Sequence, residues 1–199
     1  MIQFLEPGHT IQVMPFFDQA PPPGYATNQA PRAFFCKCPD RVYSLVKPTP
    51  PATVDQVKAG RLGMAAFQFR WLPYVAGLIT YVPLNNDSII TGKFTGCWLA
   101  IFRMGGQKYL AHIGTDTLPT SPLTLNVKTA WKDAVTAGQI TEVAAVKPTD
   151  YVKGPAVLAG LTPQNELVCL SFNYVGGSPS LMKVSSRKVL AGAQSPVFQ

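Results

Sequence analysis

The stretch from Thr91 to Thr115, TGKFTGCWLAIFRMGGQKYLAHIGT, constrains the fold more than any other part of the 199-residue chain. Its two halves are apolar, aromatic and β-branched, and Gly105-Gly106 lies between them. Gly-Gly suits a two-residue turn because both central positions of that turn need a positive φ. We therefore predict a β-hairpin with strands over Trp98–Arg103 and Lys108–Ile113.

The turn also predicts which residues lie opposite each other. With Gly105-Gly106 as the loop, Leu99 faces His112 and Cys97 faces Gly114. Facing residues share one side of a sheet, as do residues two apart along a strand, so Cys97 and His112 become diagonal neighbours. Their Cβ atoms are then roughly 6–8 Å apart, which a thiol and an imidazole can bridge. A three-residue loop would instead place them on opposite faces.

Cys97 and His112 have the chemistry of a nucleophile and its base. An imidazole that accepts the thiol proton produces a thiolate, which attacks electrophilic carbonyl carbons. Gly96 permits close approach to the sulfur, and the backbone amides of Gly96 and Cys97 are candidates for an oxyanion hole. The alternative, on the residues alone, is a buried cysteine and a core histidine that meet by chance, because buried free cysteines are common.

The sequence around these residues resembles the catalytic hairpin of bacterial Cys/His glutamine deamidase toxins. The segment 94–97, Phe-Thr-Gly-Cys, is similar to the Leu-Ser-Gly-Cys motif of the cytotoxic necrotizing factor catalytic domain and the Burkholderia lethal factor group. His112 follows at the spacing of the family's histidine. Thr91 matches a threonine that some relatives, and the more distant chemotaxis deamidase CheD, carry before the cysteine. Ile113 replaces a threonine of the family and so removes a hydroxyl beside the histidine.

The resemblance implies a cysteine-dependent glutamine deamidase, an amidohydrolase that converts a glutamine side chain of a target protein to glutamate. It implies a bacterial toxin or effector whose virulence chemistry needs no cofactor. Cys97 would be the nucleophile, His112 the base and Thr91 the group that orients His112. Asp87 and Asp116 are the carboxylates nearest in sequence that could orient His112 instead.

Three other functions remain open at this point. The first is a non-enzymatic binding protein on the same fold, with the hairpin as core. The second is a cysteine peptidase or acyltransferase that uses the same Cys-His pair. The third is a transglutaminase, in which an amine takes the place of water. The sequence does not identify the target protein, its glutamine or a delivery route.

Composition predicts a single catalytic-type globular domain over residues 1–199, with the Pro-rich residues 1–33 as an arm that packs on it or trails from it. Hydrophobic residues make up 47% of the chain and charged residues 14%, which is typical of a chain with a substantial core. The net charge is +7, but the basic residues are scattered and show no nucleic-acid-binding pattern. We therefore expect no nucleic-acid partner. The resemblance to the deamidase toxins implies a target protein as partner, and we expect a monomer.

Membrane and metal signals are weak. Residues 1–6 lack the basic start and apolar core of a signal peptide, and the most apolar window, Tyr74–Leu84, is too short to cross a bilayer. We therefore expect no membrane contact and a cytoplasmic location in the producing cell, with delivery into a target cell if the protein is a toxin. The four cysteines show neither a disulfide framework nor zinc spacing.

The remaining segments predict short strands and one clear helix. Apolar residues at helical spacing predict a helix over Val127–Gly138 with Asn126 as N-cap, after a loop over Leu118–Pro122, and a short helix is predicted over Thr53–Gly60. Strands are expected over Ile11–Phe17, 33–46 (one strand or two), Gly63–Leu72, Gly77–Pro83, Ile140–Val146, Pro155–Leu161 (or a turn), Glu166–Tyr174 and Leu181–Leu190, the last two as a second hairpin. The pattern predicts an α+β fold with a β-sandwich-like core of short, mostly antiparallel strands and a few helices packed outside.

Overall fold

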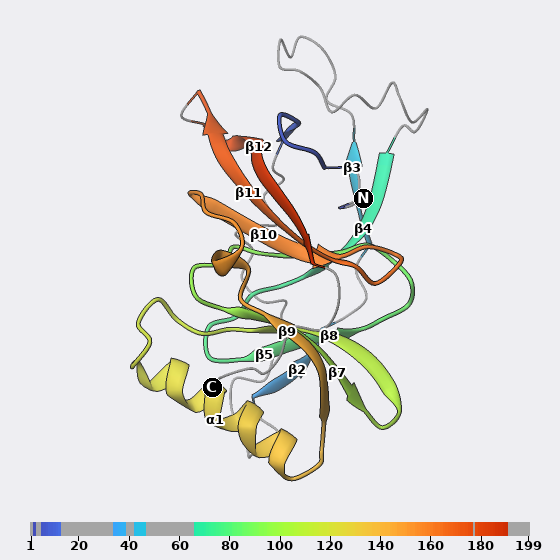
Figure 1. Ribbon diagram of the computed structural model, residues 1–199, viewed down its shortest axis with the longest axis vertical. Coiled ribbons are helices and arrows are strands. Elements are labelled where there is room, and N and C mark those ends of the chain that lie inside the picture. Colours follow the sequence, from blue (N-terminus) through green and yellow to red (C-terminus); the bar gives the residue numbers. More distant parts are fainter. Residues whose placement is uncertain are drawn as a thin grey trace.

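Two β-sheets make up most of the described chain (Figure 1). The computed structural model describes residues 2, 5–12, 34–38, 42–46, 66–176 and 178–190. Its strands are β1 (Thr10–Gln12), β2 (Phe35–Lys37), β3 (Val42–Val46), β4 (Ala66–Leu72), β5 (Ile79–Pro83), β6 (Ile89–Gly92), β7 (Trp98–Met104), β8 (Gln107–Ile113), β9 (Thr141–Val146), β10 (Ala156–Leu161), β11 (Leu167–Val175) and β12 (Ser178–Leu190). The helical elements are α1 (Pro122–Thr136) and the short 3-10 helix η4 (Pro148–Asp150).

Strand pairing is mostly antiparallel. The seven-stranded sheet has the order β1-β12-β11-β10-β6-β4-β3, and the five-stranded sheet has the order β2-β5-β8-β7-β9. The β4–β6 and β2–β5 pairs are parallel. The predicted α+β fold is confirmed, with α1 as the one α-helix in the described ranges where a few were expected.

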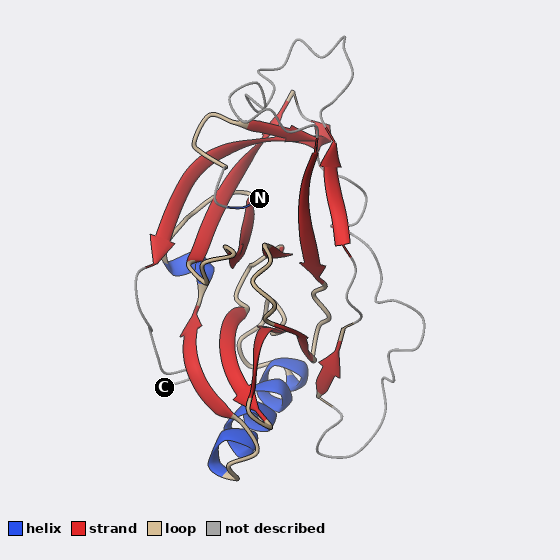
Figure 2. Ribbon diagram, turned by 90° about the vertical axis from the view of Figure 1, so that its right-hand side faces the viewer, coloured by secondary structure: helices blue, strands red, loops and turns tan. Residues whose placement is uncertain are grey.

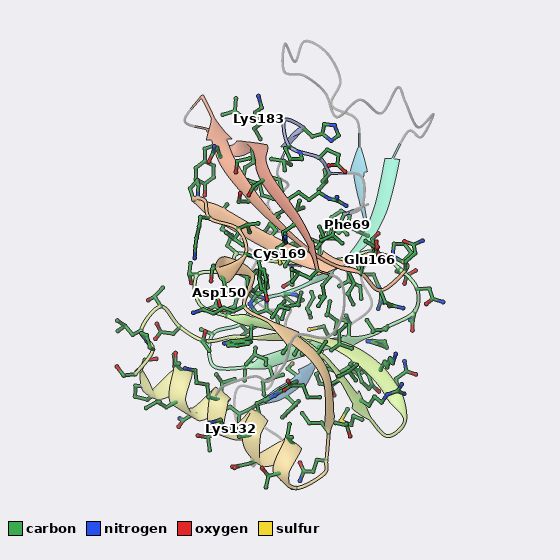
Figure 3. The ribbon with its side chains drawn as sticks, viewed as in Figure 1. Phe69, Lys132, Asp150, Glu166, Cys169 and Lys183 are labelled. Carbon is green, nitrogen blue, oxygen red and sulfur yellow. The ribbon has the colours of Figure 1, made fainter. Side chains whose placement is uncertain are left out.

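The hydrophobic core has three layers, because alternate residues of each strand point to opposite faces of its sheet. The first layer lies between the sheets and includes Leu99, Leu110 and Ala159. A second layer covers the outer face of the seven-stranded sheet. The third joins the other face of the five-stranded sheet to α1, which lies on the side away from the seven-stranded sheet (Figure 2). Figure 3 shows Cys169 of the first layer in the middle of the molecule.

The predicted hairpin forms between β7 and β8. Met104 pairs with Gln107, and Leu99 pairs with His112, as the two-residue turn requires. The turn glycines have φ values of 55° and 82°, a region that residues with a Cβ rarely occupy. The second predicted hairpin, β11 with β12, is also present.

The start of α1 differs from the prediction. Its N-cap is Ser121, whose side chain accepts a hydrogen bond from the backbone of Thr124 at 3.1 Å. Pro122 follows, and proline is favoured at the first helical position because its missing N–H has no helical partner there. The predicted N-cap at Asn126 is therefore wrong, because the helix begins one turn before the apolar periodicity, and Leu123 and Leu125 of that turn are exposed. Val135 follows the apolar spacing of the predicted helix but is 37% exposed.

Several predicted elements fall partly or wholly on residues that the structure does not describe. The helix over Thr53–Gly60 lies outside the described residues, as does most of the 1–33 arm. Within that arm, Ile2 and Leu5 are buried in the second core layer. The 33–46 segment contains two strands, β2 and β3, which belong to different sheets. No helix within the described ranges is long and apolar enough to span a membrane.

Candidate functional site

His112 lies on β8 and points into the layer between the two sheets. The residue is fully buried. Its ring stacks on Phe94, with 4.4 Å between centroids and 9° between planes, and it contacts the ring of Tyr74 at a centroid distance of 5.2 Å. The two aromatic rings therefore fix the position of the imidazole.

A hydrogen bond joins the two sheets at this histidine. Thr91 Oγ1 lies 2.6 Å from His112 Nδ1. Thr91 sits on β6, between Leu72 of β4 and Ala159 of β10, so its backbone is held on both sides. The contact orients the imidazole and occupies Nδ1, which leaves Nε2 as the nitrogen that can exchange a proton with another group.

Cys97 precedes β7 and lies on the same side of the hairpin. Leu99 pairs with His112, and Cys97 and Leu99 both belong to the core layer between the sheets. The thiol is buried, with 1% of the residue exposed, and it donates a hydrogen bond to the Thr115 carbonyl at 3.1 Å. Within the described chain His112 Nε2 has no hydrogen-bond partner, so no hydrogen bond joins it to the sulfur in this state.

Burial determines the charge state of the pair. Burial raises the pKa of the Cys97 thiol and outweighs the nearby Thr115 hydroxyl and backbone amides, which lower it. Burial also lowers the pKa of His112 to about 3. At neutral pH the site therefore holds a neutral thiol and a neutral imidazole, and a neutral imidazole is the form that accepts a proton.

The backbone before Cys97 forms the side of the site nearest to solvent. Thr95 is exposed and Gly96 is half-buried, although Cys97 itself is buried. The backbone amides of Gly96, Thr115 and Thr95 lie close enough to the sulfur to lower the thiol pKa, although the Thr115 amide donates its hydrogen bond to the Ile113 carbonyl at 3.0 Å. The Gly96 amide is one of these neighbours of the sulfur, and its role in holding an oxyanion stays a prediction.

Sequence reasoning favoured core or rim packing for Tyr74 over the lining of a cleft, and it gave Thr115 no role of its own. The Tyr74 hydroxyl donates to the Thr115 carbonyl at 3.1 Å, the same oxygen that accepts from Cys97. Tyr74 comes from the loop between β4 and β5, and a Cβ on Gly114 would lie only 2.0 Å from the Val75 carbonyl oxygen of that loop. Gly114 was the signal in the sequence, because its missing side chain lets the loop that carries Tyr74 pack against the hairpin.

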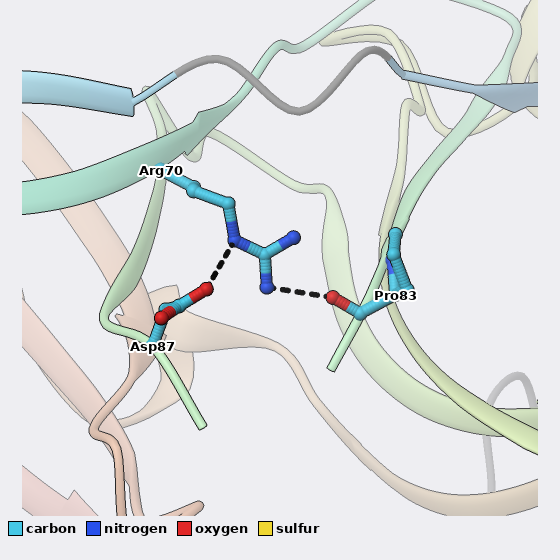
Figure 4. A network of polar contacts seen from close by, with 3 residues as sticks. All are labelled: Arg70, Pro83 and Asp87. Atoms are coloured by element: carbon cyan, nitrogen blue, oxygen red, sulfur yellow. Dashed lines mark hydrogen bonds and ion pairs between the residues drawn. The ribbon is translucent and has the colours of Figure 1, made fainter. Parts of the chain in front are cut away.

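The two carboxylates considered as partners of His112 have other contacts. Asp87 pairs with Arg70, with Oδ2 3.1 Å from Nε, and Arg70 also donates to the Pro83 carbonyl at 2.7 Å (Figure 4). The Asp116 carboxylate accepts from the Leu118 backbone at 2.8 Å and so orders the loop before α1. In the described chain Thr91 is the residue that hydrogen-bonds to His112 Nδ1.

Two buried polar side-chain atoms at the site have no hydrogen-bond partner in the described part of the chain. They are His112 Nε2 and Thr115 Oγ1. Such atoms cost free energy when buried and are rare without a functional reason.

No cluster of three or more metal-binding side chains occurs among the described residues. The described titratable groups at the site are therefore the thiol, the imidazole, the Tyr74 hydroxyl and the nearby Asp116 carboxylate. This set can perform nucleophilic and acid–base chemistry.

No protein-family model matches the chain, and no curated protein matches it. Among solved structures, the fold is weakly similar to the crystal structure of the C-terminal domain of CNFy from Yersinia pseudotuberculosis. The two are 14% identical with a TM-score of 0.28, and the alignment covers 62% of this chain and 62% of that domain. Similarity at this level is too low to show a shared family.

Proposed function

We propose that the protein is a cysteine-dependent amidohydrolase that deamidates a glutamine side chain of a target protein. The proposal rests mainly on the buried imidazole of His112. Thr91 orients this ring through Nδ1, and its Nε2 has no hydrogen-bond partner among the described residues. An imidazole that served only as core would be expected to have both nitrogens paired. An unpaired Nε2 on the same face of the hairpin as a thiol supports a role for His112 as a general base.

The reaction begins with proton transfer from the thiol to the imidazole. Cys97 Sγ gives its proton to His112 Nε2 and attacks the glutamine carboxamide carbon. The carbonyl oxygen becomes an oxyanion, for which the backbone amides of Gly96 and Cys97 are the proposed donors. The C–N bond then breaks, and His112 gives the proton to the departing nitrogen, which leaves as ammonia.

Water completes the cycle. His112 Nε2 removes a proton from the water, whose oxygen attacks the thioester carbon. The C–S bond breaks, the sulfur recovers a proton from His112, and the product is a glutamate side chain on the target. No metal or cofactor takes part in either half of this proposed reaction.

One movement must precede the first step. The resting thiol donates to the Thr115 carbonyl and not to His112, so its S–H bond has to rotate toward Nε2. The site must also open, because Cys97 and His112 are 1% and 0% exposed. Tyr74 is half-buried and contacts the His112 ring, so displacement of its side chain is the opening that the structure favours.

The choice of a protein glutamine as substrate comes from the resemblance of the Phe94–Cys97 and His112 motifs to the deamidase toxins. Under this proposal the partner is a target protein, and the chain acts as a toxin or effector. Conversion of a neutral amide to a carboxylate places a charge in the target, which can disable an interface or an active site.

A second candidate, a non-enzymatic binding protein, is favoured by the burial of Cys97. If the protein only binds a partner, Cys97 should be buried and its thiol hydrogen-bonded within the core, and the residue is 1% exposed with its thiol donating to a carbonyl. It gives no reason for the unpaired Nε2 of His112. The two candidates therefore differ in whether the imidazole changes the reactivity of the thiol.

The test is ammonia release from a cell extract incubated with the full chain, followed by peptide mass spectrometry for glutamine-to-glutamate conversion. We expect conversion with the wild type and none with Cys97→Ser or His112→Ala. Cys169→Ser, which changes another buried cysteine of the same core layer, is the matched control and should retain activity. Cleaved peptides would indicate a peptidase, and incorporation of an added fluorescent amine would indicate transglutamination. No Cys97-dependent product at all would favour the binding protein.

A further inference from the structure

Thr115 has two polar groups in the site, and they have different contacts. Its carbonyl accepts hydrogen bonds from Cys97 Sγ and from the Tyr74 hydroxyl, each at 3.1 Å. Its hydroxyl has no hydrogen-bond partner within the described chain, although the residue is only 3% exposed. A buried hydroxyl without a partner lowers stability, so its presence here requires an explanation.

The unpaired hydroxyl lies on the sulfur side of the site. A Cβ placed on Gly96, the residue before Cys97, would be 3.9 Å from Thr115 Oγ1. The same hydroxyl is near enough to Cys97 to lower the pKa of the thiol, although burial outweighs this effect. The resting thiol donates its proton to a hydrogen bond with the Thr115 carbonyl. A thiolate has no proton to donate and can only accept a hydrogen bond. The Thr115 hydroxyl, which has no partner in the resting state, can then donate to the sulfur.

We propose that Thr115 is a positioning residue that holds Cys97 in two successive states, through its carbonyl in the resting thiol and through its hydroxyl in the thiolate. The inference rests on the proposed function, because it takes Cys97 as the nucleophile. When the thiol proton passes to His112 Nε2, the carbonyl contact breaks and the Oγ1–H group donates to the sulfur. The hydroxyl proton stays on Oγ1 throughout, so no further proton acceptor is needed.

The groups that surround the sulfur keep constant charge across the neutral pH range. Burial lowers the pKa of His112 to about 3. Burial, with smaller contributions from the charges of Cys97 and Asp116, raises the pKa of Tyr74 to about 12. The Leu118 amide lowers the pKa of Asp116, which stays ionised. A pH profile of Cys97 alkylation therefore reports ionisation of the thiol itself.

The experiment measures alkylation of Cys97 by iodoacetamide against pH in the full chain, with peptide mass spectrometry as the readout. Thr115→Val replaces the hydroxyl by a methyl group and keeps the carbonyl. We expect its ionisation midpoint to rise by about one pH unit, the effect of one hydrogen bond to a charged group. Thr115→Ser should restore the wild-type midpoint. Thr117→Val, the same change at an exposed position, is the matched control and should leave the midpoint unchanged.

The outcomes separate this inference from the proposed function. If Thr115→Val has the wild-type midpoint while Cys97 still depends on His112, the inference about Thr115 is wrong and the proposed function stands. If wild-type Cys97 reacts no faster than Cys169 and His112→Ala changes nothing, the proposed function fails, and the inference fails with it. If circular dichroism shows that Thr115→Val does not fold, Thr115→Ala takes its place with the same expected shift.

Discussion

The two faces of the β7–β8 hairpin are buried in different ways. The face toward α1 is packed by aromatic rings, with Phe102 against Trp131 at 5.6 Å and against Tyr109 at 5.3 Å. The polar atom of Trp131 is paired, because its indole N–H donates to Glu142 at 2.9 Å. The face toward the seven-stranded sheet carries Cys97 and His112, and its His112 Nε2 has no partner among the described residues.

This difference shows what each face contributes. An apolar face with paired polar atoms gives maximum stability, whereas an unpaired buried imidazole lowers it. Proteins retain such destabilising groups mainly where activity needs them. The α1 face therefore accounts for stability, and the inter-sheet face for the proposed chemistry. Four substitutions, each on one face, test this difference through stability or through the reactivity of Cys97.

The largest effect is expected from Phe102→Ala on the α1 face. Phe102 is fully buried, and its ring contacts Phe35, Tyr81, Tyr109 and Trp131. Removal of the ring should lower the free energy of unfolding by about 3–5 kcal/mol, measured by urea denaturation. The rate of Cys97 alkylation in the folded fraction should not change. A large change in that rate would show that the two faces are not separable.

A pH effect on stability is expected from His112 on the inter-sheet face. Its pKa is about 3 in the folded protein and 6.5 in the reference state, so between these values the unfolded chain binds a proton that the folded chain does not. Stability is therefore full above pH 6.5 and falls as the pH drops toward 3, by up to a few kcal/mol. Urea midpoints measured across this range should show the loss.

The control for this effect is a pair of histidine substitutions. His112→Leu should flatten the pH dependence and change stability little at neutral pH. His9→Gln removes the other histidine of the chain and should keep the pH dependence, because His112 is still present. An unchanged slope in His112→Leu would show that the buried imidazole is not its source.

Thr91→Val tests the orientation of the imidazole. The variant loses the 2.6 Å contact to Nδ1 and keeps the β-branched shape in the centre of the sheet. We expect about a fivefold slower alkylation of Cys97, since one hydrogen bond contributes about 1 kcal/mol. Thr91→Ser should react at close to the wild-type rate. Equal alkylation rates for the valine and serine variants would show that the Thr91 hydroxyl does not orient His112.

The smallest effect is expected from Tyr74→Phe. The variant keeps the ring against His112 and loses the hydrogen bond to the Thr115 carbonyl. A side chain held by one hydrogen bond fewer should move aside more often, so alkylation of Cys97 should become a few-fold faster. Slower alkylation would mean that the Tyr74 hydroxyl assists the reaction and does not close the site.

The sequence predicted the hairpin and its register well, because both depend on local signals. Gly105-Gly106 determined the turn, and the turn placed Cys97 and His112 on one face. The start of α1 was missed because the prediction followed the apolar spacing alone. The helix begins earlier, at a capping serine followed by a proline.

Other parts of the site depend on packing that no local pattern records. The contact between Thr91 and His112 crosses from one sheet to the other, and strand patterns do not tell which strands face each other. Tyr74 reaches the site through the fold of its loop. The depth of Cys97 is also a property of the whole core, since equally apolar surroundings in sequence occur at half-buried Cys36.

The most direct test of the central claim is the rate of Cys97 alkylation at neutral pH in the wild type and in His112→Ala. Cys169 serves as an internal reference, because it is fully buried and burial raises its pKa to about 12. If His112 Nε2 is the base for Cys97, the wild-type thiol should react much faster than Cys169 and lose that advantage in His112→Ala. Equal rates for Cys97 in the two proteins would contradict the claim.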